Sequence, residues 1–400
     1  MINRASVGAG GIRKIAVLLG MSESVCRDMI RGITRYARAH GPWSLHIIEA
    51  DFEQVVPQMA IWGCSGIVAY IPQKRIDEAV IAAAAPTVAI CLTDEQRHPT
   101  NPLSRLSDVC FDAADQMIGK LAAEHFQQRQ ICSFAYVGQD EVSWSERRER
   151  AFRAQVKALG FDTNVYHHPA RQRVSDWQPS HAIFIDWLIG LPKPVGVLAC
   201  NDARGRQLLE SCRLAGLPVP EQVAVLGVDN DAVFCEMADP PLSSVALDSE
   251  TAGYEAAELL DGLIRGRVRK SRRVFVRAMG IITRQSTDLV AVSDDDVAAA
   301  LRFIHRKYGD SLSVDDVAEA VAMSRRGLET RFRKVLGRTI LEEIHLVRIE
   351  RAKRMLLETE HSVAQVAKLT GFGTTDYFTR FFRRQVGKSP SEFRGDRSTR

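Results

Sequence analysis

The chain is 400 residues long, and since a domain usually has roughly 100 to 200 residues, this length indicates two or three domains and excludes a single small module. Hydrophobic residues make up 46% and charged residues 26%, which is typical of folded proteins and excludes a chain disordered throughout. Residues 301–400 hold 21 Lys and Arg against 13 Asp and Glu, a net charge of +8, whereas residues 1–300 have a net charge of −4. This asymmetry favours an anionic polymer as the partner of the C-terminal quarter alone.

Eight cysteines lie in the first 300 residues, mostly in apolar runs. They form no CxxC pair, and no histidine stands at zinc-ligand spacing from them, so we predict free thiols in a reducing compartment, with no metal site and no cofactor. No apolar run reaches the roughly 18 residues of a membrane span, and residues 15–20 are too short for a signal-peptide core. We therefore predict a cytoplasmic protein that does not contact a membrane.

The first 300 residues alternate between short apolar runs and helical patterns. Residues 15–20 predict a strand buried on both faces of a parallel sheet, and residues 24–39 follow with apolar side chains four apart, as in a helix. Further strands are predicted at residues 44–49, 66–71, 87–92, 107–111, 133–138, 195–200 and 223–228. Further helices are predicted at residues 114–127, 146–159 and 202–215. This alternation predicts an α/β fold of two doubly wound parallel-sheet lobes, with a boundary near residues 111–114.

Polar residues cluster where these strands end, which is where doubly wound lobes bind ligands. Carboxylates and carboxamides suit a sugar, because each buried hydroxyl needs a hydrogen-bonding partner. The alternative is that each Asp or Asn caps the following helix. For a single residue the two interpretations have equal weight, whereas for the whole set we favour ligand binding. The set consists of Met21, Ser22, Glu23, Asp112, Asn201, Asp202, Asp229 and Asn230.

Three segments, residues 144–152, 198–202 and 226–230, resemble the effector domain of LacI-type repressors and the related periplasmic sugar-binding proteins. The resemblance implies a sugar site between the lobes. Residue 151 is alanine where that family usually has glycine, a mild departure. The predicted ligand-binding residues are Met21, Ser22, Arg148, Asn201, Asp202 and Asp229.

The composition changes near residue 293, so we predict one domain of two lobes over residues 1–290 and an all-α domain over residues 291–400. Residues 312–337 read as helix, turn and helix, with an apolar stripe on each helix. A second such unit follows about fifty residues later, and a long helix over residues 339–357 joins the two. In the second unit we predict that Tyr377, Phe378, Phe381 and Phe382 face inward.

Each unit carries a polar face at the start of its second helix. Arginine, threonine and carboxylate side chains on such a face can read guanine, the thymine methyl group and the cytosine amino group in the major groove. The predicted DNA-reading residues are Arg326, Glu329, Thr330 and Arg333 in the first unit and Thr375, Asp376, Thr379 and Arg380 in the second. Flanking cations are predicted to contact phosphate, although plain solvated charge explains some of them equally well. They are Arg325, Arg331, Lys334, Arg338, Arg383, Arg384 and Lys388.

The C-terminal domain resembles the DNA-binding domain of the AraC family, through residues 316–318, 324–332, 348–357, 371–372 and 390–394. A LacI-type domain followed by an AraC-type domain is similar to the family of bacterial xylose-operon regulators. That similarity implies D-xylose as the effector, a homodimer on paired operator DNA sites, contact with RNA polymerase and activation of xylose catabolism genes.

Other functions have less support in the sequence. A regulator of the same class that responds to a different sugar, or that represses, stays open. An enzyme is disfavoured, because the glycines of residues 8–11 precede a strand instead of following one, and residues 63–66 lack the spacing of a nucleophile elbow. We predict no catalytic residue. A transported sugar receptor is disfavoured by the missing signal-peptide core.

Overall fold

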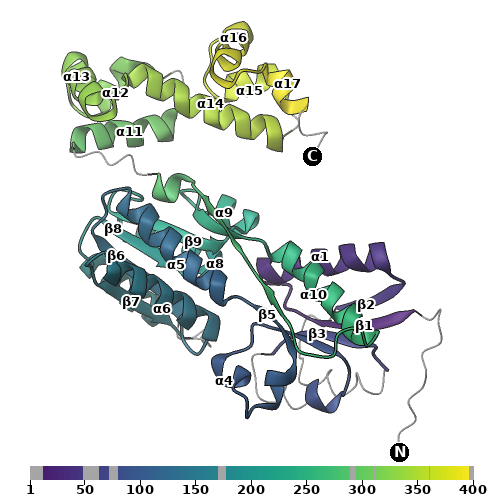
Figure 1. Cartoon of the computed structure of the whole chain (residues 1–400). Helices are drawn as coiled ribbons and strands as arrows, with labels where there is room; N and C mark the ends of the chain where they lie inside the picture. The colour runs from purple at the N-terminus through teal and green to yellow at the C-terminus, as the bar shows by residue number, and fades with distance from the viewer. Residues whose placement is uncertain are drawn as a thin grey trace, which may run out of the picture. The chain divides into compact units, whose positions relative to one another are not determined.

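The computed structural model describes residues 12–47, 63–71, 80–169, 177–288, 294–309, 312–359 and 361–395. Contacts between Cα atoms divide the chain into two compact units, Met1–Leu289 and Val290–Arg400. We call them the α/β unit and the helical unit (Figure 1). Among the described residues, no helix combines the length and apolar character needed to cross a bilayer.

The α/β unit contains two six-stranded sheets. In lobe 1 the strands have the order β11-β5-β4-β3-β1-β2 and are all parallel. In lobe 2 the order is β12-β10-β9-β8-β6-β7, and only β12 is antiparallel. The strands of lobe 1 are β1 (Arg13–Leu18), β2 (Trp43–Ile47), β3 (Gly66–Tyr70), β4 (Thr87–Ile90), β5 (Ser107–Cys110) and β11 (Arg273–Phe275). Those of lobe 2 are β6 (Ser133–Gln139), β7 (Thr163–His168), β8 (Val195–Ala199), β9 (Val223–Asp229), β10 (Ser243–Leu247) and β12 (Ala278–Ile282).

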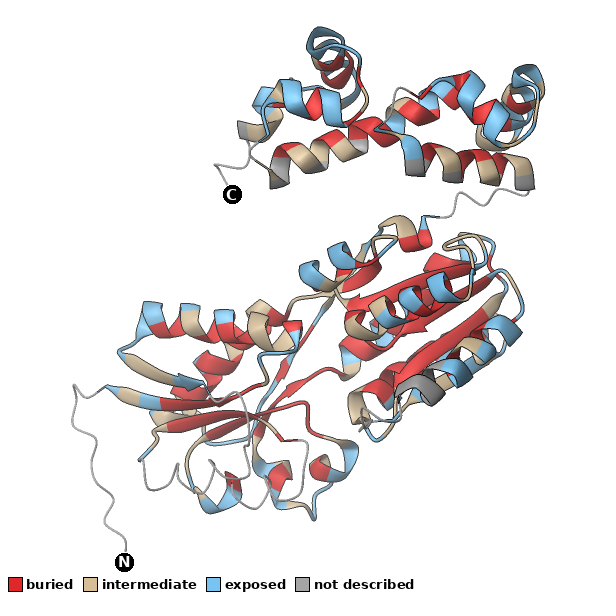
Figure 2. Ribbon diagram, turned by 180° about the vertical axis from the view of Figure 1, so that it is seen from behind, coloured by how far each residue is buried: buried red, intermediate tan, exposed pale blue. Residues whose placement is uncertain are grey.

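Helices cover both sheets, which explains why the central strands are apolar along their length. Every residue of β4 and β8 is buried, and Figure 2 shows the strand interiors in red. In lobe 1 the sheet packs against α1 (Ser24–His40) and α10 (Ser249–Ile264). Lobe 2 packs against α5 (Asp112–Gln127), α6 (Ser143–Ala158), α7 (Trp177–Gly190), α8 (Asp202–Leu214) and α9 (Ala232–Met237). Shorter elements are α4 (Asp94–Arg97) and the 3-10 helices η1 (Pro102–Arg105) and η3 (Gln285–Thr287). The predicted fold class is confirmed.

The chain passes between the lobes three times. The first passage, from β5 to α5, falls at the predicted boundary near residues 111–114. The chain then returns from β10 to α10, which packs on lobe 1, and passes again from β11 to β12. Lobe 1 is therefore discontinuous in sequence, which the prediction of a single boundary missed. The short strands β11 and β12 complete the edges of both sheets.

The helical unit has seven helices among the described residues: α11 (Asp295–Lys307), α12 (Val314–Ala320), α13 (Arg325–Leu336), α14 (Ile340–Glu358), α15 (Val363–Leu369), α16 (Thr375–Val386) and α17 (Pro390–Gly395). Side chains of Ser324 and Thr374 cap α13 and α16, the second helices of the two predicted helix-turn-helix units. Both helices end at glycines in the left-handed region, Gly337 with φ 68° and Gly387 with φ 81°, where a glycine is favoured at a helix end.

The long helix α14 belongs to two hydrophobic cores. Its first half contributes Ile340 and Ile344 to the core around α11, α12 and α13. Its second half contributes Ala352 and Leu356 to the core around α15 and α16. The two helix-turn-helix units are therefore separate packing units that are joined by one helix.

Candidate functional site

Arg148 occupies a buried position at the carboxyl ends of the lobe 2 strands. Its guanidinium group donates to Asp115 Oδ1 (3.1 Å), to the main-chain oxygen of Cys200 (2.6 Å) and to Asp229 Oδ1 (3.4 Å). The side chain is only 4% exposed, so its charge has little access to water. Two carboxylates and a carbonyl compensate it, which is the arrangement a buried guanidinium requires.

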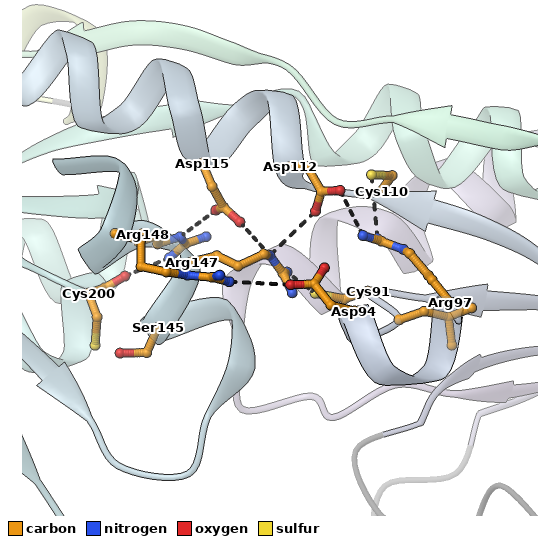
Figure 3. A network of polar contacts seen from close by, with 12 residues as sticks. Cys91, Asp94, Arg97, Cys110, Asp112, Asp115, Ser145, Arg147, Arg148 and Cys200 are labelled. Carbon is orange, nitrogen blue, oxygen red and sulfur yellow. Dashed lines mark hydrogen bonds and ion pairs between the residues drawn. The ribbon is translucent and has the colours of Figure 1, made fainter. Parts of the chain in front are cut away.

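A second set of arginines continues this network toward lobe 1 (Figure 3). Arg147 binds Asp115 (3.0 Å) and Asp112 (3.4 Å) and donates to Cys91 Sγ (2.8 Å) at the end of β4. Arg97 binds Asp112 (2.7 Å) and Asp108 (3.0 Å). Asp112 thus lies between an arginine of each lobe, at the point where the chain first passes from lobe 1 to lobe 2.

Close packing of α5 on α6 sets the geometry of these pairs. A Cβ atom at Gly119 would lie 2.6 Å from the main-chain carbon of Ala151 and 2.7 Å from the nitrogen of Phe152. Only glycine permits this approach, which brings Asp115 on α5 within hydrogen-bonding distance of both arginines on α6. Residue 151, where the LacI-type pattern usually has glycine, is a buried alanine. The glycine at this close contact is Gly119 on the facing helix α5.

Asp229 lies at the last position of β9 and has an unusual backbone conformation, with φ 102°, and Asn230 follows with φ 53°. Burial raises the pKa of the Asp229 carboxyl well above its usual value, and the negative charges of Asp202 and Glu23 add to this while Arg148 opposes it. Strained backbone at a non-glycine residue costs about 1 to 3 kcal/mol and persists at sites where function requires it. Asp229 is therefore the predicted site residue that the geometry supports most strongly.

Asn201 and Asp202 use their side chains to hold the fold together. Asn201 is the N-cap of α8 and accepts from the main-chain nitrogen of Arg204 (3.0 Å). Asp202 is 1% exposed and accepts from Asp231 N (2.6 Å) and Ser244 Oγ (2.6 Å). Burial raises the pKa of Asp202 to about 7. The capping alternative therefore describes the contact of Asn201, whereas Asp202 instead joins the loop after β9 to β10.

Met21 and Ser22 are exposed and follow β1 in lobe 1. Their main-chain oxygens both accept from Arg27 Nη1 (2.9 Å each). The other terminal nitrogen of Arg27 binds Asp231 in lobe 2 (2.5 Å). The structure thus connects the loop after β1 with Asp202 through Arg27 and Asp231, two residues that the sequence did not single out.

Trp144 and Tyr70 supply the aromatic surface of this region. Trp144 packs against the hydrophobic cores of both lobes, and the Arg148 guanidinium lies 5.1 Å from the centre of its ring. Burial raises the pKa of the Tyr70 hydroxyl, with contributions from Cys91 and Cys26, and Trp144 hydrogen-bonds to it. Tyr70, Cys91 and Cys26 therefore lie in the same region of lobe 1, facing Trp144 of lobe 2.

Charges in the network nearly cancel. The three arginines Arg97, Arg147 and Arg148 face four carboxylates, Asp108, Asp112, Asp115 and Asp229. Among these described residues the arginines do not outnumber the carboxylates, so the network does not favour a phosphate or a carboxylate as its ligand. Paired carboxylates and guanidinium groups instead offer directed acceptors and donors, which suits a neutral polyhydroxyl ligand.

Most residues that contact Arg148 and Asp112 in this network were not predicted from the sequence. Asp115 lies one helical turn after Asp112, so helical spacing could have identified it, whereas Arg147 is adjacent to Arg148 and helical spacing does not place the two on one face. Arg97 and Arg27 bind residues remote in sequence, and no local pattern marks them. The contacts of the paired carboxylates and of Arg27 depend on how the two lobes pack, so they could not be predicted from the sequence.

In the first helix-turn-helix unit, Arg326, Thr330 and Arg333 are exposed on α13, and Glu329 is partly exposed. They lie opposite Leu328 and Phe332, which are fully buried. Thr330 Oγ1 donates to the main-chain oxygen of Arg326 (2.8 Å). The predicted face therefore exists as one polar surface of α13.

The second unit repeats this arrangement on α16. Thr375, Asp376 and Arg380 are exposed and Thr379 is partly exposed, whereas Phe378 and Phe382 are fully buried and Phe381 is 7% exposed. The prediction that Tyr377 faces inward was wrong, since 42% of it is exposed. Tyr377 lies about 100° around the helix from Phe378, so its ring packs only on the core edge, near Phe372 (6.1 Å between centroids).

Three of the flanking arginines already have partners in the helical unit. Arg325 binds Asp315 (3.1 Å), Arg331 binds Asp296 (2.5 Å), and Arg338 binds Glu343. Ion pairs at the surface contribute only about 0 to 1 kcal/mol, so exchange of Asp315 or Asp296 for a phosphate costs little.

Comparison with known proteins agrees with this two-part structure. Residues 123–287 match the periplasmic binding protein-like domain family, and residues 317–396 match a helix-turn-helix domain family. The chain is 29% identical over 385 residues to the xylose operon regulatory protein of Escherichia coli (strain K12), covering 95% of this chain and 96% of the relative. The corresponding protein of Haemophilus influenzae is 28% identical over 391 residues, covering 95% and 98%.

The solved structure described as the xylose-binding transcription activator xylR superposes with a TM-score of 0.80 at 27% identity, covering 96% of this chain and 98% of that one. The similarity extends across both the α/β unit and the helical unit. These relatives are transcription regulators, not enzymes.

Proposed function

We propose that D-xylose controls this DNA-binding transcription regulator, which is similar to the xylose operon regulatory proteins, by binding at the strand-end network of the α/β unit. The observation that carries the proposal is the nearly neutral cluster around Arg148 and Asp229, which offers polar groups without a surplus of charge. Among neutral sugars we choose xylose because the names of the similar proteins refer to it.

Asp229 and Arg148 are the residues to which we assign direct sugar contact. The Asp229 carboxylate shares Arg148 with Asp115 at a long 3.4 Å separation, so sugar hydroxyls can take over part of this interaction. Trp144 offers an apolar ring beside the same guanidinium, and sugar carbon–hydrogen faces pack well on such rings. Asn201 contributes through its helix cap, and Asp202 through its support of Asp231.

Contacts between the lobes supply the means of response. Arg27 of lobe 1 binds Asp231 of lobe 2, and Arg147 of lobe 2 binds Cys91 of lobe 1. A sugar that binds residues from both lobes favours the arrangement in which these contacts form, since a ligand shifts an equilibrium by its difference in affinity for two states. The lobe arrangement then changes the operator affinity of the helical unit.

We further propose that the protein acts in the cytoplasm as a homodimer on paired operator sites, and that it activates xylose catabolism genes through contact with RNA polymerase. The four residues on α13 and the four on α16 are the proposed DNA-reading residues. A repressor with the same effector, or a regulator of another pentose, is the second candidate, because the loop after β1 leaves Met21 and Ser22 exposed and open to more than one sugar.

Calorimetric titration of the full chain with D-xylose, L-arabinose, D-ribose and D-glucose tests the effector. We expect saturable heat with D-xylose and weaker binding of the other three sugars. Tryptophan emission should change with it, because Trp144 lies in the network. No heat with any pentose would overturn the xylose assignment and leave the DNA-binding class intact.

A further inference from the structure

The loop between α10 and β11 is strongly basic. Residues 265–273 contain six arginines and lysines and no acid, although the first 300 residues carry a net charge of −4. Each of these six cations is exposed. The excess of basic residues in this loop is therefore a local feature that the overall charge of the first 300 residues does not explain.

The main chain of this loop is held at both ends. Gly266 has φ 67° and closes α10, with Arg267 N donating to Gly262 O (2.9 Å). Val268 packs against the core of lobe 1. At the far end, Arg272 N donates to Ser107 Oγ (3.2 Å), and Asp108 N donates to Arg272 O (3.0 Å). The loop thus presents its cations on a fixed backbone, which lowers the entropic cost of binding.

Ordinary structural roles account for two of the six cations. Arg265 pairs with Asp261 (2.7 Å), and Arg273 lies close enough to Asp108 to oppose the rise of its pKa. Within the described part of the chain, Arg267, Arg269, Lys270 and Arg272 make no ion pair. Cations also stabilise a helix C-terminus, but this effect fades within the last turn, so it extends to Arg267 and not to the later three.

A small hollow adjoins the loop. Ser104, Ser271, Arg272 and Arg273 line it, together with Arg97 and Asp108. Arg105 is exposed on η1 directly beside Ser104. Serine hydroxyls with arginine guanidinium groups are common ligands of backbone phosphates in protein–DNA interfaces. Ser271, Arg272 and Arg273 belong both to the loop and to the lining of the hollow, so the basic loop and the hollow adjoin on lobe 1.

We propose that this surface, residues 267–273 with Arg105, binds backbone phosphates of the DNA outside the sites read by the helix-turn-helix units. The inference rests on the proposed function, because the helical unit of the same chain brings duplex DNA to a high effective concentration. Duplex DNA carries about one charge per 1.7 Å and is the polyanion that a regulator meets. The contact adds affinity without sequence preference.

The salt dependence of DNA binding tests the proposal with the full-length chain. The variant Arg269→Gln/Lys270→Gln is compared with Arg38→Gln/Lys157→Gln, which removes two exposed cations elsewhere on the α/β unit. The probe is a mixed-sequence duplex of about 60 base pairs, titrated over a range of KCl concentrations. We expect the loop variant to lower the slope of log K against log salt by about 2 and the affinity near 0.1 M salt by roughly 10- to 100-fold.

The control variant should match the unmodified protein in its salt slope and DNA affinity, and thermal melting should be unchanged in the loop variant. Equal slopes in all three proteins would overturn the proposal, and so would an equal fall in the two variants. Unchanged DNA affinity with reduced transcription in a reconstituted polymerase assay would overturn it too, since the surface would then bind a protein. Failure of the unmodified protein to bind any DNA would instead contradict the proposed function itself.

Discussion

The two polar surfaces of this protein differ in how their charges are compensated. Around Arg148 the arginines and carboxylates are buried and bind one another, so each side chain supports the fold and the site together. On α13 and α16 the polar side chains are exposed and do not belong to the hydrophobic cores in which these helices pack. A substitution in the buried network should therefore change stability and function together, whereas one on the helical faces should change function alone.

The largest expected effect is on stability, from Arg148→Met. Loss of the guanidinium leaves buried Asp229 without its arginine partner and leaves Asp115 with Arg147 alone, and breaking a buried pair costs about 3 to 5 kcal/mol. All five tryptophans lie in the first 300 residues, so urea unfolding followed by tryptophan emission measures the α/β unit specifically. Arg326→Ala on α13 is the contrasting variant; because the helical unit has no tryptophan, its unfolding is followed by far-UV circular dichroism, and the expected change is within about 0.5 kcal/mol. Equal losses of stability in the two variants would contradict the expected difference between the buried network and the exposed faces of α13 and α16.

Asp229→Asn tests sugar binding with little change of shape. A hydrogen bond to a charged group contributes about 1.5 to 3 kcal/mol, so we expect D-xylose affinity to fall about 10- to 100-fold, while DNA binding without sugar stays unchanged. Asp162→Asn, at an exposed position of lobe 2, is the matched control and should bind sugar normally. Calorimetry with all three proteins gives the answer, and normal affinity of Asp229→Asn would place the sugar elsewhere.

Arg380→Ala and Lys334→Ala separate base reading from phosphate contact in the helical unit. Removal of Arg380 should cost roughly 1 to 3 kcal/mol on the operator and relax specificity at one position. Removal of Lys334 should weaken binding to all sequences alike and lower the salt slope by about 1. Competition binding against operator variants distinguishes the two patterns. Identical patterns would show that α16 does not read bases through Arg380.

The last effect concerns the acid sensitivity of the α/β unit and develops only as the pH falls. Burial and the charge of Arg129 lower the pKa of His125 to about 3, and its ring nitrogens contact Thr287 Oγ1 (2.8 Å) and Arg129 Nη1 (3.1 Å). An unfolded histidine titrates near 6.5. Between about pH 6.5 and 3 the unfolded chain therefore binds the additional proton, and the free energy of unfolding decreases as pH falls, by up to about 1.4 kcal/mol per pH unit.

His125→Gln should remove this component, and His98→Gln, at an exposed position, should keep it. The measurement is urea unfolding at a series of pH values between 4 and 7, followed by tryptophan emission. Parallel pH profiles for the two variants would contradict the neutral, buried state assigned to His125.

The same contrast explains what could be predicted from the sequence. The faces of α13 and α16 follow from helical periodicity, because polar side chains three and four residues apart must lie opposite Leu328, Phe332, Phe378 and Phe382. Eight of the twelve described strands were predicted for a similar reason, since a strand buried on both faces is apolar throughout, whereas β7, β10, β11 and β12 were not predicted. In both cases the pattern is local.

The buried network could be predicted only in part. Arg148 came from a family resemblance and Asp229 also from its position after a predicted strand, whereas the contacts of Asp115, Arg147 and Arg27 depend on which elements meet. The close approach of α5 and α6 at Gly119, and the return of the chain to lobe 1 at α10, are tertiary facts without a local signal. Asn201 and Asp202 show the converse, because a polar residue after a strand serves a helix cap or a ligand equally well until its contacts are known.

In the proposed function, sugar bound at the strand-end network controls DNA binding by the helical unit. This control of DNA binding is tested most directly by measuring binding of the full chain to DNA upstream of its own and adjacent operons, with and without D-xylose, for the unmodified protein and for Asp229→Asn. We predict that D-xylose changes the operator affinity of the unmodified protein and leaves that of Asp229→Asn unchanged. An equal response of both proteins, or no response of the unmodified protein to D-xylose, would contradict the account.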